Sequence, residues 1–401
     1  MPVNIYLLKP GELSLKGGNR KIFEGVLKRN LLRMLGASQP GLSGPGAPKP
    51  KIRIEITNGR FFVHCDDGDC ALVEGVLSRL MGISGWARTG SYAKTVEAVL
   101  RACVEEGKKL FEQGLSSFKI EARRTDKSFP LDSYGLRSEG GKAILDAVPG
   151  LKVDVHNPEG LIRVEIREKA YVYSNSRKGL GGLPVGTAGR GILLLSGGID
   201  SPVAGFLMAS RGMGIDAVYF HAYPYTSPEA RQKVIRLAEI VGAYCMGIRL
   251  HIAGFTKIQA RIKERVPLAW TTVLLRMAMV DCAEKLALSI KGKCLITGES
   301  LSQVASQTIE NLSCTQAGIG LPILRPLIGA GKESIIKMAE QIGTYETSIL
   351  PYEDCCILFS PPHPILRGDP LEASALYESL ELKELIEEAL RNRETIKCGF
   401  Y

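Results

Sequence analysis

The sequence contains 401 residues, of which 45% are apolar and 23% are charged, a composition typical of soluble globular proteins. Domains usually hold roughly 100–200 residues, so this length predicts two or three domains. Apolar runs such as 192–195 are far shorter than the roughly 18 residues of a membrane-spanning helix, and residues 1–20 lack the apolar centre of a signal peptide. The sequence therefore excludes a membrane-spanning protein, and we expect a cytoplasmic one.

Nearly all of the formal net charge of +9 comes from residues 1–60. This segment contains eleven Lys and Arg residues against three Glu residues, an excess of eight positive charges. A basic surface of this kind suits a polyanion, because each cation that faces a phosphate releases condensed counterions. A solvated basic face without a ligand is the alternative, and charge alone does not decide between them.

The ten cysteines indicate reduced thiols rather than a disulfide framework, because no secretion signal is present. None of them forms a C-x-x-C pair, so the pattern does not signal a zinc site. We expect most of them to be small buried side chains.

Residues 1–75 form the first predicted domain, a small α+β unit. Apolar periodicity predicts strand 3–8, helix 19–35, and strands 52–57 and 61–65, with a Gly/Pro/Ser-rich surface loop at 38–50. Residues 76–178 form the second predicted domain. Its predicted elements are helix 71–81, strand 86–92, helix 95–113, strand 117–123, helix 134–148, and strands 152–157, 162–166 and 169–174. The glycine-rich stretch 177–191 is the predicted linker.

Residues 179–401 form the third predicted domain, in which strands alternate with helices. The predicted elements are strand 192–195, helix 201–211, strand 216–221, a helix capped by Ser227 with Pro228 at its first position, strand 244–250, helices 256–266 and 271–288, strand 294–297 and helix 333–342. Buried strands separated by helices indicate a doubly wound parallel sheet. Residues 371–392 predict one acidic amphipathic helix at the edge of the domain, and Cys398 is expected in a flexible tail.

The most informative stretch is ILLLSGGIDSPVAG at 192–205. An apolar strand ends at Leu195, a Ser-Gly-Gly turn follows, and a helix begins near Asp200. Two glycines let backbone N–H groups approach a phosphate closely, and the start of the helix adds a positive dipole. Ser196 and Ser201 supply hydroxyl donors, and Asp200 is placed to hold Mg²⁺ or to orient the nucleotide. A generic strand-to-helix turn is the alternative.

The pattern S-G-G-x-D-S resembles the PP-loop of the ATP pyrophosphatase superfamily. Those enzymes release pyrophosphate from ATP and attach AMP to a carbonyl oxygen, which makes that oxygen a leaving group. The resemblance implies that the loop holds ATP and that the ends of the first two strands hold the adenine. The implied ATP-binding residues in this region are Leu194, Leu195, Ser196, Gly197, Gly198, Asp200, Ser201, Tyr219 and Phe220.

Five further segments narrow the resemblance to one family. The segment 10–24 resembles the N-terminal signature of tRNA 4-thiouridine synthetases, and 118–133 with 151–174 resembles a THUMP domain, an RNA-binding module. The segments 297–308 and 350–364 resemble the catalytic motifs of the same synthetases. The resemblance implies a ferredoxin-like unit at 1–75, a THUMP α/β domain at 76–178, and at 179–401 a PP-loop domain similar to the adenine nucleotide alpha hydrolases.

The resemblance also implies the reaction. ATP and Mg²⁺ activate a uridine of tRNA, at position 8, by adenylating its carbonyl oxygen, and sulfur then replaces that oxygen. Arg276, Gly298 and Gln307 are further implied nucleotide contacts. Arg325 and Lys332 suit either RNA or the nucleotide phosphates, and the sequence does not choose between them.

Sulfur delivery is assigned by resemblance to Cys355, which matches the active-site cysteine of the family as a persulfide carrier. Cys356 is the rival for that role and a candidate second thiol. Many relatives carry a C-terminal rhodanese domain, whereas this sequence ends at Tyr401, so we expect a cysteine desulfurase to donate sulfur directly. The role of the family in thiamine thiazole synthesis, an iron–sulfur cluster and the oligomeric state stay open, and a homodimer is compatible with the sequence.

The predicted tRNA contacts are basic residues of the first two domains, with Phe129 expected to stack on a base. They are Lys16, Arg20, Lys21, Arg123, Arg124 and Lys127. Two alternatives remain. One is another PP-loop tRNA-modifying synthetase, whose relatives usually carry C-x-x-C pairs, and the other is a non-catalytic tRNA-binding protein with a degenerate ATP site.

Overall fold

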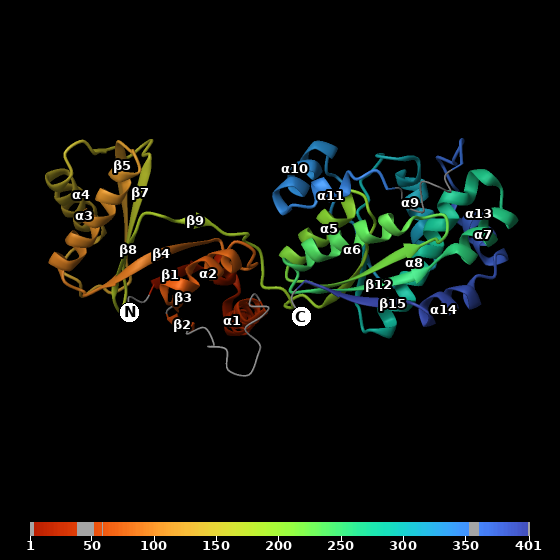
Figure 1. Cartoon of the computed structure of the whole chain (residues 1–401), viewed down its shortest axis with the longest axis horizontal. Helices are drawn as coiled ribbons and strands as arrows, with labels where there is room; N and C mark the ends of the chain where they lie inside the picture. Colours follow the sequence, from red (N-terminus) through yellow and green to blue (C-terminus); the bar gives the residue numbers. More distant parts are fainter. Residues whose placement is uncertain (1–3, 38–51, 58, 353–360, 400–401) are drawn as a thin grey trace. The chain divides into compact units, whose positions relative to one another are not determined.

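The computed structural model describes residues 4–37, 52–57, 59–352 and 361–399. Contacts divide the chain into two compact units (Figure 1). The first comprises the described residues up to Arg20 and those from 52 to Gly181, and the second comprises the remainder of the helix that Arg20 begins and the residues from Gly182 onward. Among the described residues, no helix is long and apolar enough to cross a membrane.

The first unit is built on one nine-stranded sheet with the order β2-β3-β1-β4-β8-β7-β5-β6, and β9 pairs with β4. Its strands are β1 (Asn4–Lys9), β2 (Arg53–Thr57), β3 (Arg60–Cys65), β4 (Gly85–Tyr92), β5 (Ser117–Arg124), β6 (Lys152–Val153), β7 (Gly160–Ile166), β8 (Ala170–Tyr173) and β9 (Arg177–Lys178). Its helices are α2 (Cys70–Leu77), α3 (Val96–Glu112) and α4 (Ser133–Ala147), with short 3-10 turns η1 (Gly11–Leu15), η2 (Gly17–Asn19) and η3 (Asp67–Asp69).

Strand β4 belongs to both halves of this sheet. Its first part, Gly85–Thr89, pairs antiparallel with β1, and its last part, Gly90–Tyr92, pairs antiparallel with β8. The pairing of β9 with the start of β4 places Arg177 and Lys178 in the sheet, although the sequence predicts them as the beginning of the linker. The sheet is therefore continuous from β2 to β6.

The predicted strand 152–157 is shorter than expected. Strand β6 ends at Val153, because the Oδ1 atom of Asp154 accepts hydrogen bonds from the backbone N–H groups of His156 and Asn157, at 2.8 and 2.9 Å. An aspartate that bonds the backbone two and three residues ahead closes a local turn, which competes with strand pairing.

The second unit contains a six-stranded sheet with the order β14-β13-β10-β11-β12-β15. Its strands are β10 (Arg190–Leu194), β11 (Gly214–His221), β12 (Ile248–Gly254), β13 (Cys294–Ile296), β14 (Ile323–Leu324) and β15 (Glu394–Cys398). Its helices are α1 (Arg20–Ala37), α5 (Asp200–Ser210), α6 (Pro228–Gly242), α7 (Thr256–Arg265), α8 (Thr271–Ser289), α9 (Ile309–Gln316), α10 (Lys332–Ile342), α11 (Tyr345–Ser348), α13 (Pro370–Ser379) and α14 (Lys383–Arg391), with 3-10 turns η4 (Leu268–Trp270) and η5 (Ala305–Gln307).

Helices cover both faces of this sheet, as predicted. On β10, Leu193 faces Gly205 of α5, whereas its neighbour Ile192 belongs to the apolar core around α8. Helices α5, α6, α10 and α11 contact one another, and α7, α8, α9, α13 and α14 form a second group (Figure 1). In the sheet, β11 and β12 lie on one side of β10, and β13 and β14 lie on its other side. The strand order therefore reverses between β10 and β13, the kind of position where open α/β sheets bind ligands.

The C-terminal region differs from its prediction. Residues 371–392 form two helices, since Glu381 adopts a positive φ of 51° between α13 and α14. Ala373 and Ile386 of these helices are completely buried in the core around α8 rather than resting at its edge. Cys398 is buried on β15, which pairs antiparallel with β12, so the expectation of a flexible tail at this residue is wrong.

Candidate active site

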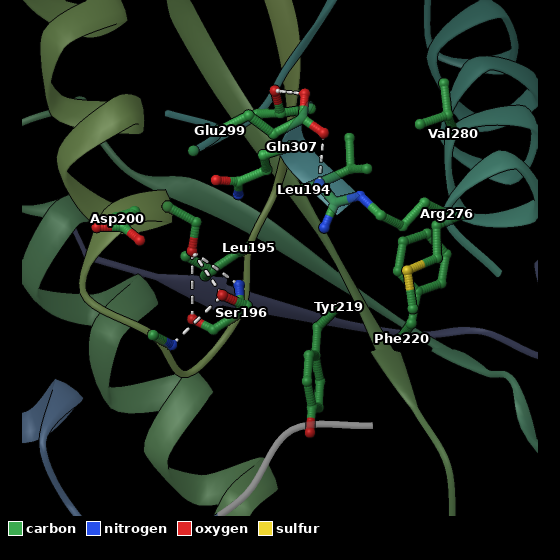
Figure 2. A pocket seen from close by; sticks show the side chains of 15 residues that line it. Leu194, Leu195, Ser196, Asp200, Tyr219, Phe220, Arg276, Val280, Glu299 and Gln307 are labelled. Carbon is green, nitrogen blue, oxygen red and sulfur yellow. Dashed lines mark hydrogen bonds and ion pairs between the residues drawn. The ribbon is translucent and has the colours of Figure 1, made fainter. Parts of the chain in front are cut away.

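A cavity of about 220 Å³ opens at the carboxyl ends of β10 and β11, beside the segment that follows β13 (Figure 2). Its walls come from the ends of β10 and β11, the start of α5, helix α8, and the segment after β13. The lining residues are Leu194, Leu195, Ser196, Gly198, Asp200, Ser201, Tyr219, Phe220, Arg276, Met279, Val280, Thr297, Gly298, Glu299 and Gln307. The structure thus gathers the predicted ATP-binding residues around one cavity, with Gly197 of the same turn outside the lining set.

The turn between β10 and α5 is held by two serines. The Oγ atom of Ser201 accepts a hydrogen bond from the backbone N–H of Ser196 at 2.9 Å and lies 3.1 Å from the Oγ atom of Ser196. The Ser196 hydroxyl in turn accepts from the backbone N–H of Gly198 at 3.3 Å. These bonds fold the turn back over the first residues of α5. The backbone N–H groups at the start of α5 are therefore presented at the cavity, an arrangement that suits an anion.

Gly298, directly after β13, packs against the start of α5. A Cβ atom at this position would lie 2.6 Å from the backbone N of Ser201 and 2.8 Å from the carbonyl carbon of Asp200. The resemblance implies Gly298 as a nucleotide contact, and the structure shows that its close neighbour is the backbone of the phosphate-binding turn. Gly298 therefore brings β13 and α5 together at the switch point.

Glu299, which the sequence analysis does not single out, is the most connected side chain of the site. Its Oε2 atom accepts from Nε of Arg325 at 2.7 Å and from Oγ1 of Thr297 at 2.8 Å, and its Oε1 atom accepts from Arg276 (Figure 2). Burial acts to raise the pKa of Glu299, but the two guanidinium groups and the Thr297 hydroxyl outweigh it, so the pKa lies below its ordinary value. The side chain is therefore an anion that fixes two arginines at the cavity.

Asp200, at the first position of α5, carries the second carboxylate of the described cavity wall. Its Oδ1 atom accepts from Nζ of Lys332 at 2.7 Å, and its Oδ2 atom accepts from Nε2 of Gln303 at 2.9 Å. Lys332 begins α10, far away in sequence. The structure thereby places Arg325 and Lys332 beside this cavity, whereas the sequence leaves open whether they contact RNA or the nucleotide phosphates.

The other side of the cavity is apolar. Leu194, Phe220, Met279 and Val280 supply its wall, with the Phe220 ring 4.6 Å from the ring of Phe255 behind it. Gln307 also lines the cavity, and the buried Oε1 atom of its amide has no hydrogen-bond partner among the described residues. An apolar slot with one directional amide suits a flat heterocyclic ring that carries polar edges.

The predicted sulfur carrier Cys355 and its rival Cys356 lie outside the described residues. The described cysteines of the second unit are Cys245, Cys282, Cys294, Cys314 and Cys398. All five are buried, as expected, and burial raises the pKa of each thiol, to about 12 for Cys282 and about 11 for Cys398. Buried thiols with raised pKa values are poor nucleophiles.

The predicted tRNA-binding residues of the second predicted domain fall into two kinds. Arg123 at the end of β5 and Lys127 are exposed. The guanidinium of Arg124 instead donates to the carbonyl oxygens of Phe129 at 2.8 Å, Lys127 at 3.3 Å and Leu131 at 3.4 Å, so it holds the loop after β5 in shape. The ring of Phe129 is buried in the core of this half, so the expectation that it stacks on a base is wrong.

The predicted N-terminal contacts surround the start of α1. Lys16 precedes η2 and is half-buried, and Lys21 is exposed. The guanidinium of Arg20 lies over Gly59, where an added Cβ atom would meet it at 1.7 Å. Gly59 also has a positive φ of 74°, a backbone conformation that favours glycine at that position.

The fold and the cavity define a class of protein. A doubly wound sheet with an anion-binding turn after its first strand, arginines clamped at the switch point and an apolar slot beside them is a nucleotide-binding α/β domain. Residues 186–382 match the family described as "Thiamine biosynthesis protein (ThiI)", residues 93–175 match the THUMP domain, and residues 5–87 match the ThiI ferredoxin-like domain. The first unit therefore joins a ferredoxin-like domain and a THUMP domain.

Comparison with individual proteins identifies the family. A protein of Treponema pallidum strain Nichols named "Probable tRNA sulfurtransferase" is 47% identical over 392 residues, which cover 97% of this chain and 94% of that protein. A tRNA sulfurtransferase relative with the same printed name, from Thermoanaerobacter pseudethanolicus, is 42% identical over 96% of this chain and 97% of its own length. The chain belongs to the tRNA sulfurtransferase (ThiI) family.

Two solved structures have the same fold. One is described as a crystal structure of a 4-thiouridine synthetase–RNA complex with bound ATP; it has a TM-score of 0.88 and 34% identity and covers 99% of this chain and 100% of that chain. The other, a protein of Pyrococcus horikoshii, has a TM-score of 0.65 and 26% identity over 85% of this chain and 99% of its own.

Proposed function

We propose that this protein is an ATP-dependent tRNA sulfurtransferase that converts a uridine of tRNA, at position 8, into 4-thiouridine. The observation that carries the proposal is the cavity at the β10–β13 switch point, where an anion-binding turn and two clamped arginines meet an apolar slot. Family membership and the likeness to a synthetase solved with RNA and ATP agree with it.

In this proposal ATP binds along the cavity. The turn at 196–201 and the start of α5 bind its phosphates through backbone N–H groups, and Arg276 and Lys332 add positive charge. The adenine ring enters the apolar slot beside Phe220, in a cavity that Gln307 also lines. These residues orient the α-phosphorus toward the uridine carbonyl oxygen and exclude water from it.

Mg²⁺ fits the site through one carboxylate. Magnesium is usually held by one or two carboxylates together with substrate phosphates and water. Asp200 lies beside the phosphate-binding turn, whereas Glu299 is enclosed by Arg276 and Arg325 and is not available. Among the residues that the structure describes, no group of three or more His, Cys, Asp or Glu side chains surrounds a metal position. A bound Mg²⁺ would neutralise phosphate charge, with Asp200 as its protein ligand.

In the proposed reaction, adenylation of the uridine comes before sulfur transfer. The uridine O4 atom attacks the α-phosphorus of ATP and pyrophosphate leaves, which gives an O4-adenylated uridine. The terminal sulfur of a persulfide on Cys355 attacks C4, and AMP departs with the oxygen. A second thiol attacks the Cys355 sulfur of the resulting mixed disulfide, which releases 4-thiouridine and leaves a disulfide that an external dithiol reduces. The described thiols of the second unit are buried and weakly acidic, which disfavours them for that task, and Cys356 or an external thiol is the proposed second thiol.

We propose tRNA as the macromolecular substrate and a cysteine desulfurase as the persulfide donor. The exposed cations Arg123 and Lys127 in the THUMP half, with Lys16, Arg20 and Lys21 near the start of α1, are the proposed phosphate contacts. The hydrogen bonds from the Arg124 guanidinium to its own loop support an indirect role for that residue, through the shape of the loop after β5.

The test is nucleoside analysis of tRNA incubated with the purified protein, ATP and Mg²⁺. Sulfide replaces the persulfide donor in one series, and a desulfurase with cysteine is used in the other. We expect wild-type protein to form 4-thiouridine in both series and Cys355→Ala to form it with sulfide only. Cys70→Ala, which changes a partly exposed cysteine of the first unit, is the matched control and should behave as wild type. No thiouridine from wild-type protein in either series, while tRNA still binds, would favour a non-catalytic tRNA-binding protein.

A further inference from the structure

Lys233 of α6 is a buried lysine outside the nucleotide cavity. Only 7% of its surface is exposed, whereas Arg236 on the same helix is largely in solvent. Burying an ammonium group is costly unless hydrogen bonds compensate it. The Nζ atom of Lys233 donates to the carbonyl oxygen of Leu350 at 2.8 Å and to that of Tyr352 at 3.3 Å. This side chain therefore connects α6 to a segment more than a hundred residues further along the chain.

That segment also touches the phosphate-binding turn. Helix α11 ends at Ser348, whose Oγ atom donates to the carbonyl oxygen of Gly198 at 3.4 Å. The Leu350 carbonyl that Lys233 binds also accepts from the backbone N–H of Tyr352 at 2.8 Å. Residues 348–352 are thus anchored at one end to the turn that binds phosphates and at the other end to Lys233.

In sequence, Cys355 follows Tyr352 after only two intervening residues. We propose that Lys233 is a positioning residue for sulfur delivery, because it fixes the backbone from which the chain leads to the sulfur-carrying cysteine. Lys233 does not line the nucleotide cavity, and both carbonyl groups that it binds belong to residues 350–352, so we expect its loss to affect sulfur transfer more than adenylation. This inference rests on the proposed function, in which Cys355 carries the persulfide.

The experiment compares Lys233→Met with wild-type protein on two sulfur sources. Methionine keeps an unbranched side chain only one atom shorter than that of lysine and removes the ammonium group. With a desulfurase and cysteine, we expect 4-thiouridine formation by the variant to fall by about 10- to 100-fold, the order expected when hydrogen bonds from a buried charged donor are lost. With sulfide, which bypasses the persulfide on Cys355, the rate should stay within about twofold of wild type. Lys233→Gln, which keeps one N–H donor, should recover part of the loss.

Two controls separate this role from a general loss of structure. Arg236→Met changes an exposed cation of the same helix and should leave both rates unchanged. The melting temperature and the ATP–pyrophosphate exchange of Lys233→Met report on folding and on adenylation. Equal rates for variant and wild type on both sulfur sources, or an equal fall on both, would overturn the inference. Absence of thiouridine from the wild-type protein with either sulfur source would instead overturn the proposed function.

Discussion

The carboxylate of Glu299 joins three elements of the second unit, because it binds Thr297 after β13, Arg276 on α8 and Arg325 after β14. Without this carboxylate, the two half-buried guanidinium groups would lose the negative charge that holds them together. No local sequence pattern indicates this role, because Arg276 lies 23 residues before Glu299 and Arg325 lies 26 residues after it. The serines and glycines of the phosphate turn, by contrast, are neighbours in sequence, and their pattern predicts the turn directly.

Glu299→Gln should lower both stability and activity. Breaking a buried ion pair costs roughly 3–5 kcal/mol, and the neutral amide leaves Arg276 and Arg325 poorly compensated. We expect the melting temperature to fall and the ATP-dependent rate to drop by about 100-fold, measured by calorimetry and by pyrophosphate release. Glu340→Gln, at an exposed position of α10, should change neither quantity.

The loss of stability caused by Glu299→Gln should depend on pH. The pKa of Glu299 in the folded state lies below its ordinary value of 4.5, so its stabilising effect is complete above that pH and disappears as the pH falls through the lower, folded-state pKa. The difference in unfolding free energy between wild type and Glu299→Gln should therefore shrink below about pH 4.5. A constant difference from neutral to strongly acidic pH would contradict the assignment of the charge to Glu299.

At the scale of elements, the sequence predicts regular helices and strands well and misses those that depend on distant partners. Strand β12 begins at Ile248, later than the predicted 244, because Met246 and Gly247 adopt positive φ angles and separate the end of α6 from the strand. Strand β15 has the polar sequence ETIKC, and its strand conformation comes from pairing with β12 rather than from its own periodicity. The strand propensity of its residues does not predict a strand that is stabilised only by pairing with its neighbour.

Deleting β15 tests its contribution. Truncation after Asn392 would remove the partner of β12, together with the ion pair between Arg231 and Glu394 and the hydrogen bond between Thr395 and His251. The exposed strand edge should lower the melting temperature by several degrees and promote aggregation. Hydrogen exchange of the β12 amides should become faster. Deletion of 400–401 alone is the control, and an unchanged melting temperature after the longer deletion would contradict a stabilising role for β15.

At the scale of the whole molecule, the cations that face solvent determine how strongly tRNA binding depends on salt concentration. Arg123 is exposed, whereas Arg124 bonds three carbonyl groups of its own loop. Arg123→Ala should weaken tRNA binding and reduce the slope of log affinity against log salt concentration by about 1, as expected for one lost phosphate contact. Arg124→Ala should mainly speed hydrogen exchange in residues 125–131. Filter binding over a range of salt concentrations checks this pair, and an unchanged slope for Arg123→Ala would exclude it as a phosphate contact.

Helix α1 is synthesised long before the residues against which it packs. Its contacts place it in the second unit, and the buried side chain of Asn30 donates to the carbonyl oxygen of Val185, 155 residues later in the chain. At a synthesis rate of about 5–20 residues per second, the helix leaves the ribosome roughly 8–30 s before that partner exists. The THUMP domain is translated completely in this interval. The last-made half of the protein is therefore completed by a helix that was among the first parts to be synthesised.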